Sequence, residues 1–299
     1  MVQVINAFTV DVEEWYHAEL IRQRQLPVEP RDQVEEALEP LLAMLEETGV
    51  RATFFVVGEV MRKHPTLFRR IHDLGHEVAC HGMSHRPLWT MSEAELEREL
   101  GEFADLYDRV LGGGRPAGFR APTFSLNQDT RWAIPVLREF GYAYDSSIFP
   151  AQTPLYGVPG APLAPYRISA ADVRREEPRG PLWEFPMTVC AVAGLRLPVS
   201  GGAYLRLWPY RLVRRFLRDV NRTRPFAVYV HPWELYEGTP KVKGLTPMER
   251  MATYWGRRGG LGKVRALLRD FAFAPMREVL QTWAARVNSN NSHKEAHGA

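Results

Sequence analysis

Two histidines four residues apart are the first candidates for chemistry in this sequence. Residues 76–85 read HEVACHGMSH, so an apolar run ends abruptly in His81 and His85. Neutral imidazole is the commonest nitrogen ligand of zinc, and two such ligands leave room for a carboxylate and a water molecule. If the backbone turns helically after residues 77–80, both imidazoles lie on one face. The spacing therefore predicts a metal site, although most histidine pairs at this spacing are ordinary solvated residues.

Two acidic residues follow the first apolar segment of the chain. Residues 2–10 (VQVINAFTV) have the pattern of a buried strand and run directly into Asp11, Val12 and Glu13. Residues two apart in a strand share a face, so Asp11 and Glu13 point the same way while Val12 faces the packed side. Acids at the end of a buried strand are costly unless they are paired. Taken alone, the segment favours a strand end that becomes exposed to solvent.

The segments that position these residues alternate between strands and helices over the first half of the chain. The pattern predicts strands at residues 2–10, 52–57, 77–80, 117–120 and 142–146, and helices at 33–47, 59–74, 92–111 and 127–140. Such alternation indicates parallel βαβ units in a barrel or an open sheet. Functional groups gather at the carboxyl ends of the strands in these folds. Asp11, His81 and Arg120 all follow or end predicted strands.

The pattern changes after Phe149, which divides the chain into a core region (1–149), a second region (150–275) and a polar tail (288–299). The second region predicts a Pro- and Gly-rich loop at 150–181, an edge strand at 182–189, a turn at 200–204, a helix at 209–220, a strand at 226–230 that ends in His231, and helices at 245–255 and 262–272. Its arginine-rich run from Arg206 to Arg224 favours a solvated helix face. The tail is predicted to be disordered.

Composition narrows the class of protein. With 299 residues, 45% apolar and 24% charged, the chain fits a soluble globular protein with a large core. The net charge of +3 gives no indication of a nucleic-acid partner. Two cysteines, Cys80 and Cys190, provide no disulfide framework and favour a reducing compartment. No signal peptide and no apolar stretch of about 18 residues is seen, so we expect a cytoplasmic protein without a transmembrane segment. Its oligomeric state stays open.

Four of these segments together resemble a known family. Asp11-Val12-Glu13, the stretch from His81 to His85, Arg120-Ala121-Pro122 and the strand ending in His231 resemble the polysaccharide deacetylases with a NodB homology domain, carbohydrate esterase family 4. Similarity to one subgroup, encoded in bacterial exopolysaccharide loci associated with PEP-CTERM and exosortase systems, rests on the stretches YAYDSSIFP, LWEFP, GGAYLRLWPY and VYVHPWEL. In that subgroup a second family-specific region follows the NodB portion. The resemblance covers roughly residues 5–275.

The resemblance implies an α/β fold, a distorted (β/α)7-type barrel with a C-terminal extension and a metal at its mouth. It also implies a role for six residues: Asp11 as catalytic base, Arg120 as the residue that orients it, His231 as general acid, and Glu13, His81 and His85 as metal ligands. The expected metal is Zn²⁺, with Co²⁺, Ni²⁺, Fe²⁺ and Mn²⁺ as alternatives. In isolation, Arg120 would be assigned to a surface salt bridge and His231 to the core.

The sequence departs from the family pattern at the first acidic segment. The commonest pattern places two aspartates side by side, whereas Val12 separates Asp11 from Glu13 here. Strand geometry makes this spacing sensible, and it makes Glu14 a poorer ligand because Glu14 faces away. In the family, an aspartate and tryptophan motif precedes the histidine that acts as general acid, and this sequence matches that motif imperfectly. Glu184 and Asp145 are the candidates for polarising His231.

The function implied by the resemblance is removal of N-acetyl groups from N-acetylhexosamine units of a bacterial exopolysaccharide or its precursor. Three alternatives stay open: a peptidoglycan deacetylase, a cyclic imide or ureide hydrolase on the same scaffold, and a non-catalytic sugar-binding protein. Aromatic side chains offer stacking faces for sugar rings, and we expect two or three of the following at the site: Trp15, Tyr16, Trp183, Tyr204, Trp208 and Trp233.

Overall fold

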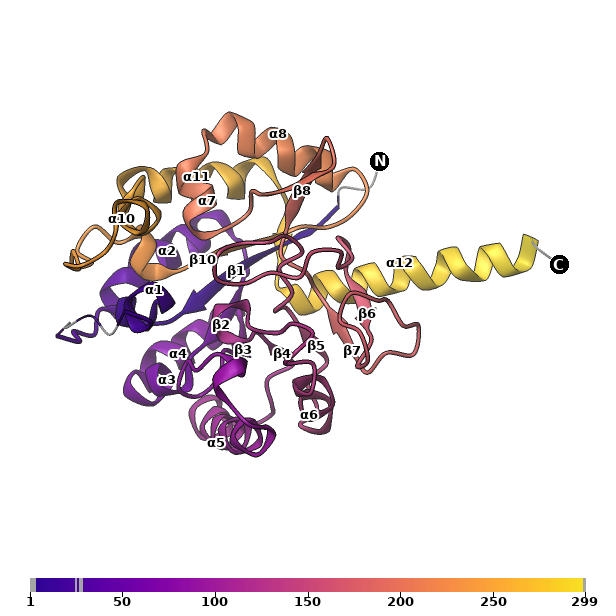
Figure 1. Ribbon diagram of the computed structural model, residues 1–299, viewed down its shortest axis with the longest axis horizontal. Coiled ribbons are helices and arrows are strands. Elements are labelled where there is room, and N and C mark those ends of the chain that lie inside the picture. The colour runs from indigo at the N-terminus through magenta and orange to yellow at the C-terminus, as the bar shows by residue number, and fades with distance from the viewer. Residues whose placement is uncertain (1–3, 25, 27–28, 298–299) are drawn as a thin grey trace.

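One curved sheet organises the fold, and the computed structural model describes residues 4–24, 26 and 29–297. Within these residues the sheet has nine strands, in the order β10-β1-β2-β3-β4-β5-β7-β6, with β11 beside β1. All neighbouring strands are parallel except β6 and β7. Figure 1 shows the sheet curling through the middle of the molecule with helices on its outer side.

The strands are short, as expected of a sheet that curls into a barrel. They are β1 (Asn6–Val12), β2 (Thr53–Val56), β3 (Glu77–Cys80), β4 (Gly118–Phe119), β5 (Tyr144–Asp145), β6 (Tyr166–Ile168), β7 (Leu182–Glu184), β10 (Ala227–Val230) and β11 (Phe273–Ala274), and a separate hairpin contains β8 (Val189–Val192) and β9 (Leu195–Pro198).

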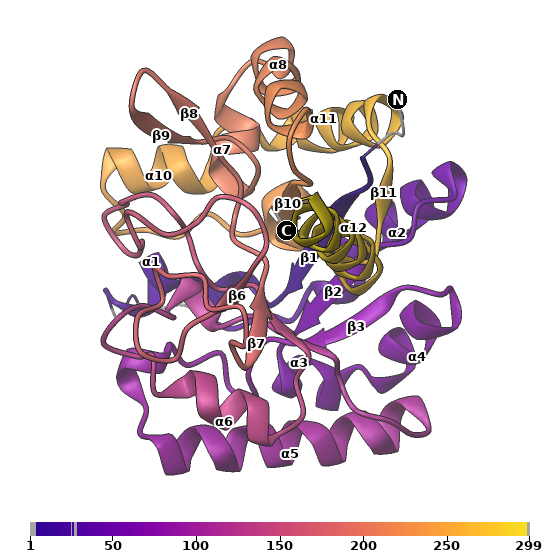
Figure 2. The same cartoon turned by 90° about the vertical axis from the view of Figure 1, so that its right-hand side faces the viewer.

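Helices connect the strands and cover the sheet. They are α1 (Glu19–Arg22), α2 (Val34–Thr48), α3 (Gly58–Lys63), α4 (Pro65–Asp73), α5 (Glu93–Leu111), α6 (Ala133–Glu139), α7 (Gly202–Leu207), α8 (Tyr210–Asn221), α9 (Pro232–Leu235), α10 (Pro247–Tyr254), α11 (Arg257–Asp270) and α12 (Met276–His297), with short 3-10 helices η1 (Trp15–His17), η2 (Leu88–Thr90) and η3 (Pro122–Phe124). In Figure 2, α12 is seen nearly end-on between α5 and α6 below and α8 and α11 above.

Alternation along β1 separates two cores. Phe8, Val10 and Val12 belong to the large outer core between the sheet and the helices, whereas Ala7 belongs to a smaller core inside the curl. Because successive strand residues point to opposite faces, Thr9 and Asp11 share the inner side with Ala7. The inner side therefore carries polar residues toward the carboxyl end of β1.

The first turns of α12 close the opposite, amino-terminal end of the curl. Met276 and Leu280 pack into the inner core. The backbone N–H of Met276 donates to the Thr53 hydroxyl (2.7 Å), and that of Arg277 donates to the Glu77 carboxylate (3.1 Å). With this end filled by side chains, the carboxyl end is the part of the barrel that can hold a ligand.

The barrel is distorted because its two outer strands do not pair with each other. The free edge of β10 instead meets residues outside the regular strands: the N–H of Ala227 donates to the Thr188 hydroxyl (2.9 Å), and the N–H of Tyr229 donates to the Ser200 carbonyl (3.1 Å). The prediction of a distorted α/β barrel is confirmed. Strands β10 and β11 both pair with β1, so both halves of the chain build one sheet.

The second half differs from the sequence prediction in three places. Residues 182–189 do not form an edge strand, because β7 lies between β5 and β6. The strand ends at Glu184, so Pro186, which has no backbone N–H to donate, lies outside it. The loop predicted at 150–181 contains β6. The turn predicted at 200–204 leads into α7, whose last carbonyls accept hydrogen bonds from the Lys263 ammonium (2.7–3.1 Å).

Helix α12 extends to His297, into the tail that the sequence predicts to be disordered from Asn288. A helix that is already nucleated by packed first turns adds further residues at little cost. Figure 1 shows this helix extending away from the rest of the molecule. Residues 298 and 299 lie outside the described residues. Among the helices of residues 4–24, 26 and 29–297, none has both the length and the apolarity to cross a bilayer.

Candidate active site

The six residues singled out from the sequence meet at the carboxyl end of the sheet. Asp11 lies near the end of β1, and His81, Arg120 and His231 directly follow β3, β4 and β10. Parallel strands end at the same edge of a sheet, so residues from four distant segments come together. Glu13 lies two residues after Asp11 and on the same side, as predicted, while Val12 is buried in the outer core.

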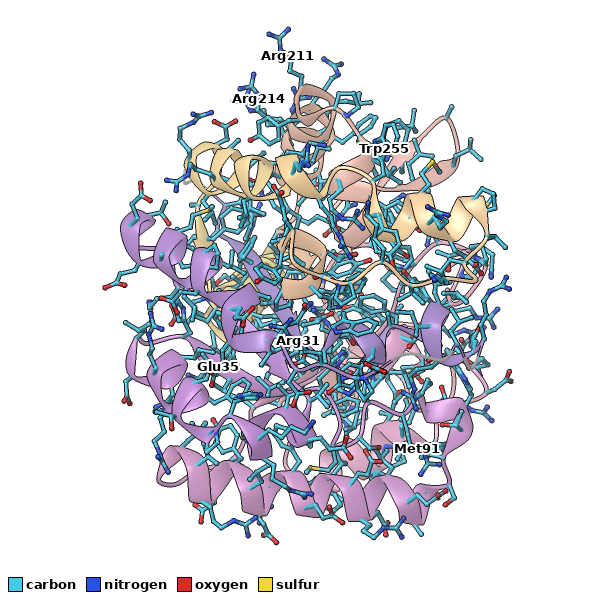
Figure 3. All side chains as sticks on the ribbon, turned by 90° about the vertical axis from the view of Figure 1, so that its left-hand side faces the viewer. Arg31, Glu35, Met91, Arg211, Arg214 and Trp255 are labelled. Carbon is cyan, nitrogen blue, oxygen red and sulfur yellow. The ribbon has the colours of Figure 1, made fainter. Side chains whose placement is uncertain are left out.

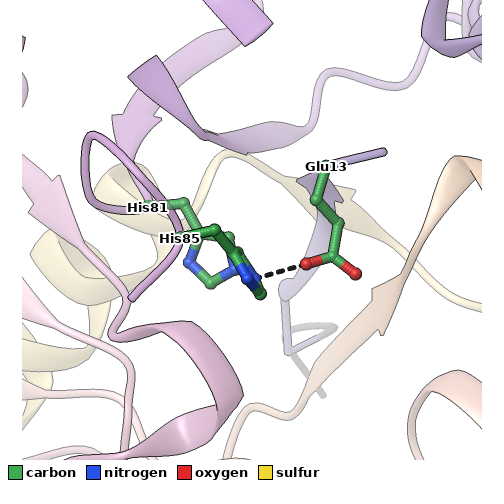
Figure 4. A group of neighbouring side chains, drawn as sticks. All are labelled: Glu13, His81 and His85. Carbon is green, nitrogen blue, oxygen red and sulfur yellow. Dashed lines mark ion pairs between the residues drawn. The ribbon is translucent and has the colours of Figure 1, made fainter. Parts of the chain in front are cut away.

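Glu13, His81 and His85 form a compact buried cluster. One ligand atom of each lies within 4.8 Å of the other two. Figure 4 shows both rings directed at the Glu13 carboxylate, and the dashed line marks the contact between His85 Nε2 and Glu13 Oε2. Two imidazoles and one carboxylate are a common ligand set of catalytic divalent metals.

Hydrogen bonds to these ligands fix which atoms can face a metal. The Nδ1 of His81 lies 2.7 Å from the carbonyl oxygen of Arg120. A carbonyl only accepts, so Nδ1 carries the proton and Nε2 is left with a free lone pair. Burial lowers the pKa of His81 to about 4, which keeps the ring neutral near pH 7. The Trp233 indole donates to Glu13 Oε1 (2.9 Å) and orients the third ligand. The donor set therefore fits a divalent metal.

The loop that holds the two histidines is not helical, so the prediction that a helical turn brings their rings together is wrong. Gly82 and His85 have φ values of 74° and 55°, so the chain reaches the ligand geometry through two left-handed residues. A non-glycine residue in this conformation costs about 1–3 kcal/mol. The loop is held by Glu99 of α5, which accepts from the N–H of Met83 (3.0 Å), and by Arg22, which donates to the His85 carbonyl.

Arg120 is fully buried and lies against Asp11. Its Nη1 contacts Asp11 Oδ1 and donates to the Thr9 hydroxyl (2.9 Å). Its Nε donates to the Ser146 carbonyl (3.1 Å), and its guanidinium lies 3.9 Å from the centre of the Phe55 ring. Every side of the guanidinium is thus occupied, so Arg120 fixes one oxygen of Asp11 and leaves Oδ2 directed toward His231.

His231 faces both carboxylates of the site. Its Nε2 lies 3.8 Å from Asp11 Oδ2 and 3.8 Å from Glu13 Oε1. Its Nδ1 lies 3.1 Å from Oε2 of Glu234, in the first turn of α9. Burial lowers the pKa of His231, but the carboxylates of Glu234, Glu13 and Asp11 outweigh it and raise the pKa to about 9. The ring is therefore charged near neutral pH and can donate a proton.

The partner of His231 is Glu234, and neither Glu184 nor Asp145 has this role. Asp145 and Glu184 lie opposite each other on β5 and β7. The Ser147 hydroxyl donates to Asp145 (2.6 Å), and the N–H of Ile148 donates to Glu184 (3.0 Å). The i, i+3 spacing of His231 and Glu234 is the signal in the sequence that could have identified the pair.

Behind Glu234 lies Arg206, which the sequence had placed on a solvated helix face but which is buried. Its Nη2 lies 3.2 Å from Glu234 Oε1 and donates to the Ala252 carbonyl (2.6 Å), and its Nη1 donates to the Trp255 carbonyl. Burial raises the pKa of Glu234, but His231 and Arg206 together lower it to about 2. Arg206 therefore keeps Glu234 ionised and connects it to the end of α10.

Glu234→Gln is expected to shift the alkaline limb of the rate–pH profile to lower pH. Glu234 favours the protonated form of His231, so loss of its charge lowers the pKa of the ring. A general acid is lost as the pH rises through its pKa, and a lower pKa means loss at lower pH. The measurement is kcat/KM against pH. Glu237→Gln, an exposed neighbour, is the matched control, and an unchanged limb in Glu234→Gln would contradict the assignment.

A cavity of about 310 Å³ opens above these residues. Its floor carries Asp11, Glu13, His81, His85 and His231, and its walls come largely from the second half of the chain, namely residues 153–156, 202–204, 229–234 and 248–253. Of the six aromatic residues proposed for the site, Tyr204 and Trp233 line the cavity. Thr123 and Phe124, also in the lining, both have positive φ values (58° and 48°), which marks a strained loop at the site.

Glu14 faces away from the cluster, as the strand pattern predicts. Its carboxylate accepts hydrogen bonds from the N–H groups of Gln33 (3.0 Å) and Val34 (3.1 Å) at the start of α2. A carboxylate at a helix N-terminus is favoured by the helix dipole. Glu14 is therefore occupied in fixing α2, and Glu13 is the carboxylate left for a metal.

Family models match the two halves of the chain. Residues 30–144 match the polysaccharide deacetylase model, and residues 146–281 match a domain of unknown function, DUF3473. The peptidoglycan deacetylase-like protein FGM2 of Gibberella zeae is 31% identical over 118 residues, which are 39% of this chain and 34% of FGM2. The match thus spans about a third of the length of that relative.

Solved structures share the fold. A polysaccharide deacetylase from Mycobacterium smegmatis has a TM-score of 0.56 and 20% identity, with 96% of this chain and 93% of that chain covered. The PuuE allantoinase has a TM-score of 0.58 and 14% identity, with 94% and 90% covered. These TM-scores show that the architecture is shared, and identities this low leave the substrate open.

Proposed function

We propose, from the match of residues 30–144 to the polysaccharide deacetylase model, that the protein is a metal-dependent hydrolase that removes N-acetyl groups from N-acetylhexosamine units of a bacterial exopolysaccharide or its precursor. The observation that carries the proposal is the convergence of Asp11, Glu13, His81, His85 and His231 on the floor of one cavity. Resemblance to the exopolysaccharide-locus subgroup, together with the DUF3473 region, supports the finer substrate class.

Glu13, His81 and His85 would hold the metal, with Zn²⁺ as the expected ion. All three are buried, and both imidazoles are directed at the Glu13 carboxylate. A divalent metal bound by such a set acidifies a bound water and polarises the carbonyl of the scissile amide. Trp233 and the Arg120 carbonyl keep two of the three ligands in orientation.

Asp11 acts as the general base and His231 as the general acid. Asp11 accepts a proton from the attacking water as its oxygen bonds to the acetyl carbon, and Arg120 holds the carboxylate in place. His231, kept protonated by Glu234, donates a proton to the sugar nitrogen as the C–N bond breaks. The products are acetate and the free amine. The base and the acid lie close together on the cavity floor, because Asp11 Oδ2 and His231 Nε2 are 3.8 Å apart.

Loss of the third ligand tests the metal site directly. Glu13→Gln is expected to lower bound zinc, measured by elemental analysis of purified protein, by more than about tenfold and to abolish acetate release from N-acetylhexosamine oligomers. The matched control is Glu14→Gln, which removes the neighbouring carboxylate from α2 and leaves the cluster intact. Full zinc content in Glu13→Gln would contradict the ligand assignment.

The same assay distinguishes the sugar substrates. Acetate release is compared among soluble N-acetylhexosamine oligomers, lipid-linked glycan intermediates and peptidoglycan fragments. Preference for peptidoglycan would favour the alternative of a peptidoglycan deacetylase, the kind of protein that the name of the Gibberella relative describes. A cytoplasmic location stays a prediction from the sequence.

A cyclic imide or ureide hydrolase is the second candidate. The separated Asp11 and Glu13 favour it, and a cavity of about 310 Å³ lies at the small end of the usual range of ligand pockets, about 300–1,000 Å³. Hydrolysis of hydantoin or allantoin at a higher kcat/KM than any N-acetylated sugar would establish this activity and overturn the deacetylase proposal.

A further inference from the structure

Helix α10 presents an apolar face to solvent. Met248, Met251 and Trp255 are 72%, 46% and 64% exposed, and they are among the most exposed large apolar residues of the described chain. Met248 and Met251, at i and i+3, lie on one side of the helix, and Trp255 is the residue that directly follows its end. Trp255 is labelled in Figure 3, where it lies at the surface well apart from Arg211 of α8. Isolated exposed apolar residues are ordinary, but three within and directly after one short helix indicate an interaction surface.

Positive charge surrounds this face. Lys241, Lys243, Arg250 and Arg258 are all exposed, and the Arg258 side chain is 91% exposed. Residues 237–259 contain five Lys or Arg and two Glu, and because Arg257 is buried, the surface carries four cations and two acids, a net charge of 4 − 2 = +2. Glu249 is paired with Arg24 (2.8 Å), which lies outside this segment, and Glu237 is paired with Arg258 (3.6 Å), which leaves Lys241, Lys243 and Arg250 as exposed cations. The uncompensated charge of the surface is therefore cationic.

The other face of α10 lines the active-site cavity. Glu249, Ala252 and Thr253 belong to the cavity wall, and Met248 belongs both to the wall and to the exposed face. The helix is firmly placed, because Thr246 and Glu249 form a capping box at its start and Arg206 donates to the carbonyls of Ala252 and Trp255 at and just past its end. The apolar cationic surface thus borders the mouth of the cavity.

An anionic lipid surface fits this combination better than the other occupants. Trp, Met and flanking Lys or Arg on one helix face are typical of helices that lie in the membrane interface, with the tryptophan at headgroup depth. A second copy of the chain on this face would set the cations of one copy against those of the other, which is unfavourable. A neutral glycan would leave the cations without partners.

We propose that α10 docks the protein onto an anionic membrane surface, so that the cavity mouth meets acetylated sugars carried on lipid. Docking itself depends only on the surface of α10, whereas the lipid-carried substrate rests on the deacetylase function proposed above. The membrane supplies both an apolar layer for Met251 and Trp255 and negative charge for the surrounding cations.

Vesicle flotation tests the docking. The wild-type protein is expected to float with phosphatidylcholine vesicles that contain phosphatidylglycerol, to stay behind with pure phosphatidylcholine, and to be released by raised salt. Met251→Ser with Trp255→Ser, neither of which lines the cavity, is expected to weaken binding about tenfold. Arg211→Gln, Arg215→Gln and Arg218→Gln together on α8 are the control and should leave binding largely unchanged.

Three outcomes overturn the docking proposal. They are absence of binding to the anionic vesicles, equal binding by the Met251→Ser/Trp255→Ser variant, and a wild-type dimer in sedimentation that this variant converts to monomer. The last would assign the face to a second copy of the chain.

Acetate release separates docking from function. A soluble N-acetylchitooligosaccharide is compared with the same sugar on a lipid anchor in anionic vesicles. We expect the Met251→Ser/Trp255→Ser variant to match wild type on the soluble probe and to be several-fold slower on the anchored one. If the variant and the wild type release acetate at equal rates from the soluble probe and also from the anchored probe, the proposal of a lipid-carried substrate is wrong. Vesicle binding without acetate release from either probe would support docking and overturn the deacetylase function.

Discussion

Asp11→Asn is expected to reduce acetate release by about 10²–10⁴-fold, the usual contribution of a general base, while bound metal stays unchanged. Asparagine has the shape of aspartate and can still accept a hydrogen bond from Arg120, but it cannot take a proton from water. The cluster of ligand atoms consists of Glu13, His81 and His85 and leaves Asp11 out. The measurement pairs kcat with zinc content.

The comparison with Glu13→Gln makes this result specific. Asp11→Asn should lose activity and keep the metal, whereas Glu13→Gln should lose both. If Asp11→Asn releases acetate at the wild-type rate, Asp11 is not the base. If neither wild type nor variant releases acetate from any N-acetylated sugar while both hold zinc and bind the sugar, the alternative of a non-catalytic sugar-binding protein is correct.

Arg120→Met is expected to lower the free energy of unfolding by about 3–5 kcal/mol. The arginine is fully buried, and its removal takes the closest cation from the buried Asp11 carboxylate, which then faces only the His231 ring at 3.8 Å. The Thr9 hydroxyl and the Ser146 carbonyl also lose a hydrogen-bond partner. Urea unfolding monitored by circular dichroism measures the change.

Two further variants separate the buried charge from general packing. Arg167→Met removes a guanidinium that lies 4.7 Å from the Trp183 ring without a buried carboxylate partner, and it should cost less than about 1 kcal/mol. Arg120→Met combined with Asp11→Asn should cost less than the sum of the two single changes, because no charge is left unpaired. Strictly additive costs would contradict the buried pair.

Several parts of the site could be read from local patterns. The apolar strand followed by Asp11 and Glu13 predicted that both carboxylates share a side, and the structure places them so, with Glu14 turned to α2. Period-two alternation depends only on the backbone of one strand, so it can be read without the rest of the molecule. Parallel strands that end at a common edge then predicted that Asp11, His81 and Arg120 would lie together.

Other parts could not be read because their cause lies elsewhere in the chain. The loop of His81 and His85 was expected to be helical, yet it takes left-handed residues that Glu99 and Arg22 hold in place. The tail was expected to be disordered because it is polar, and its helix continues from turns that pack inside the barrel.

The alternating α/β architecture and the shared side of Asp11 and Glu13 follow from short-range periodicity, and the sequence therefore predicts both. Arg120 and His231 were assigned to the site from the resemblance to a family. How the site is completed depends on contacts between segments that are far apart in the chain. Glu234 and Arg206 lie 28 residues apart, and Trp233 and Glu13 lie 220 apart. Such contacts depend on where the barrel places each segment. Residue types and spacing along the chain do not encode that placement locally. The contacts from His231 to Glu234 and from Glu234 to Arg206, and the part of α10 that lines the cavity, are therefore seen only in the folded chain.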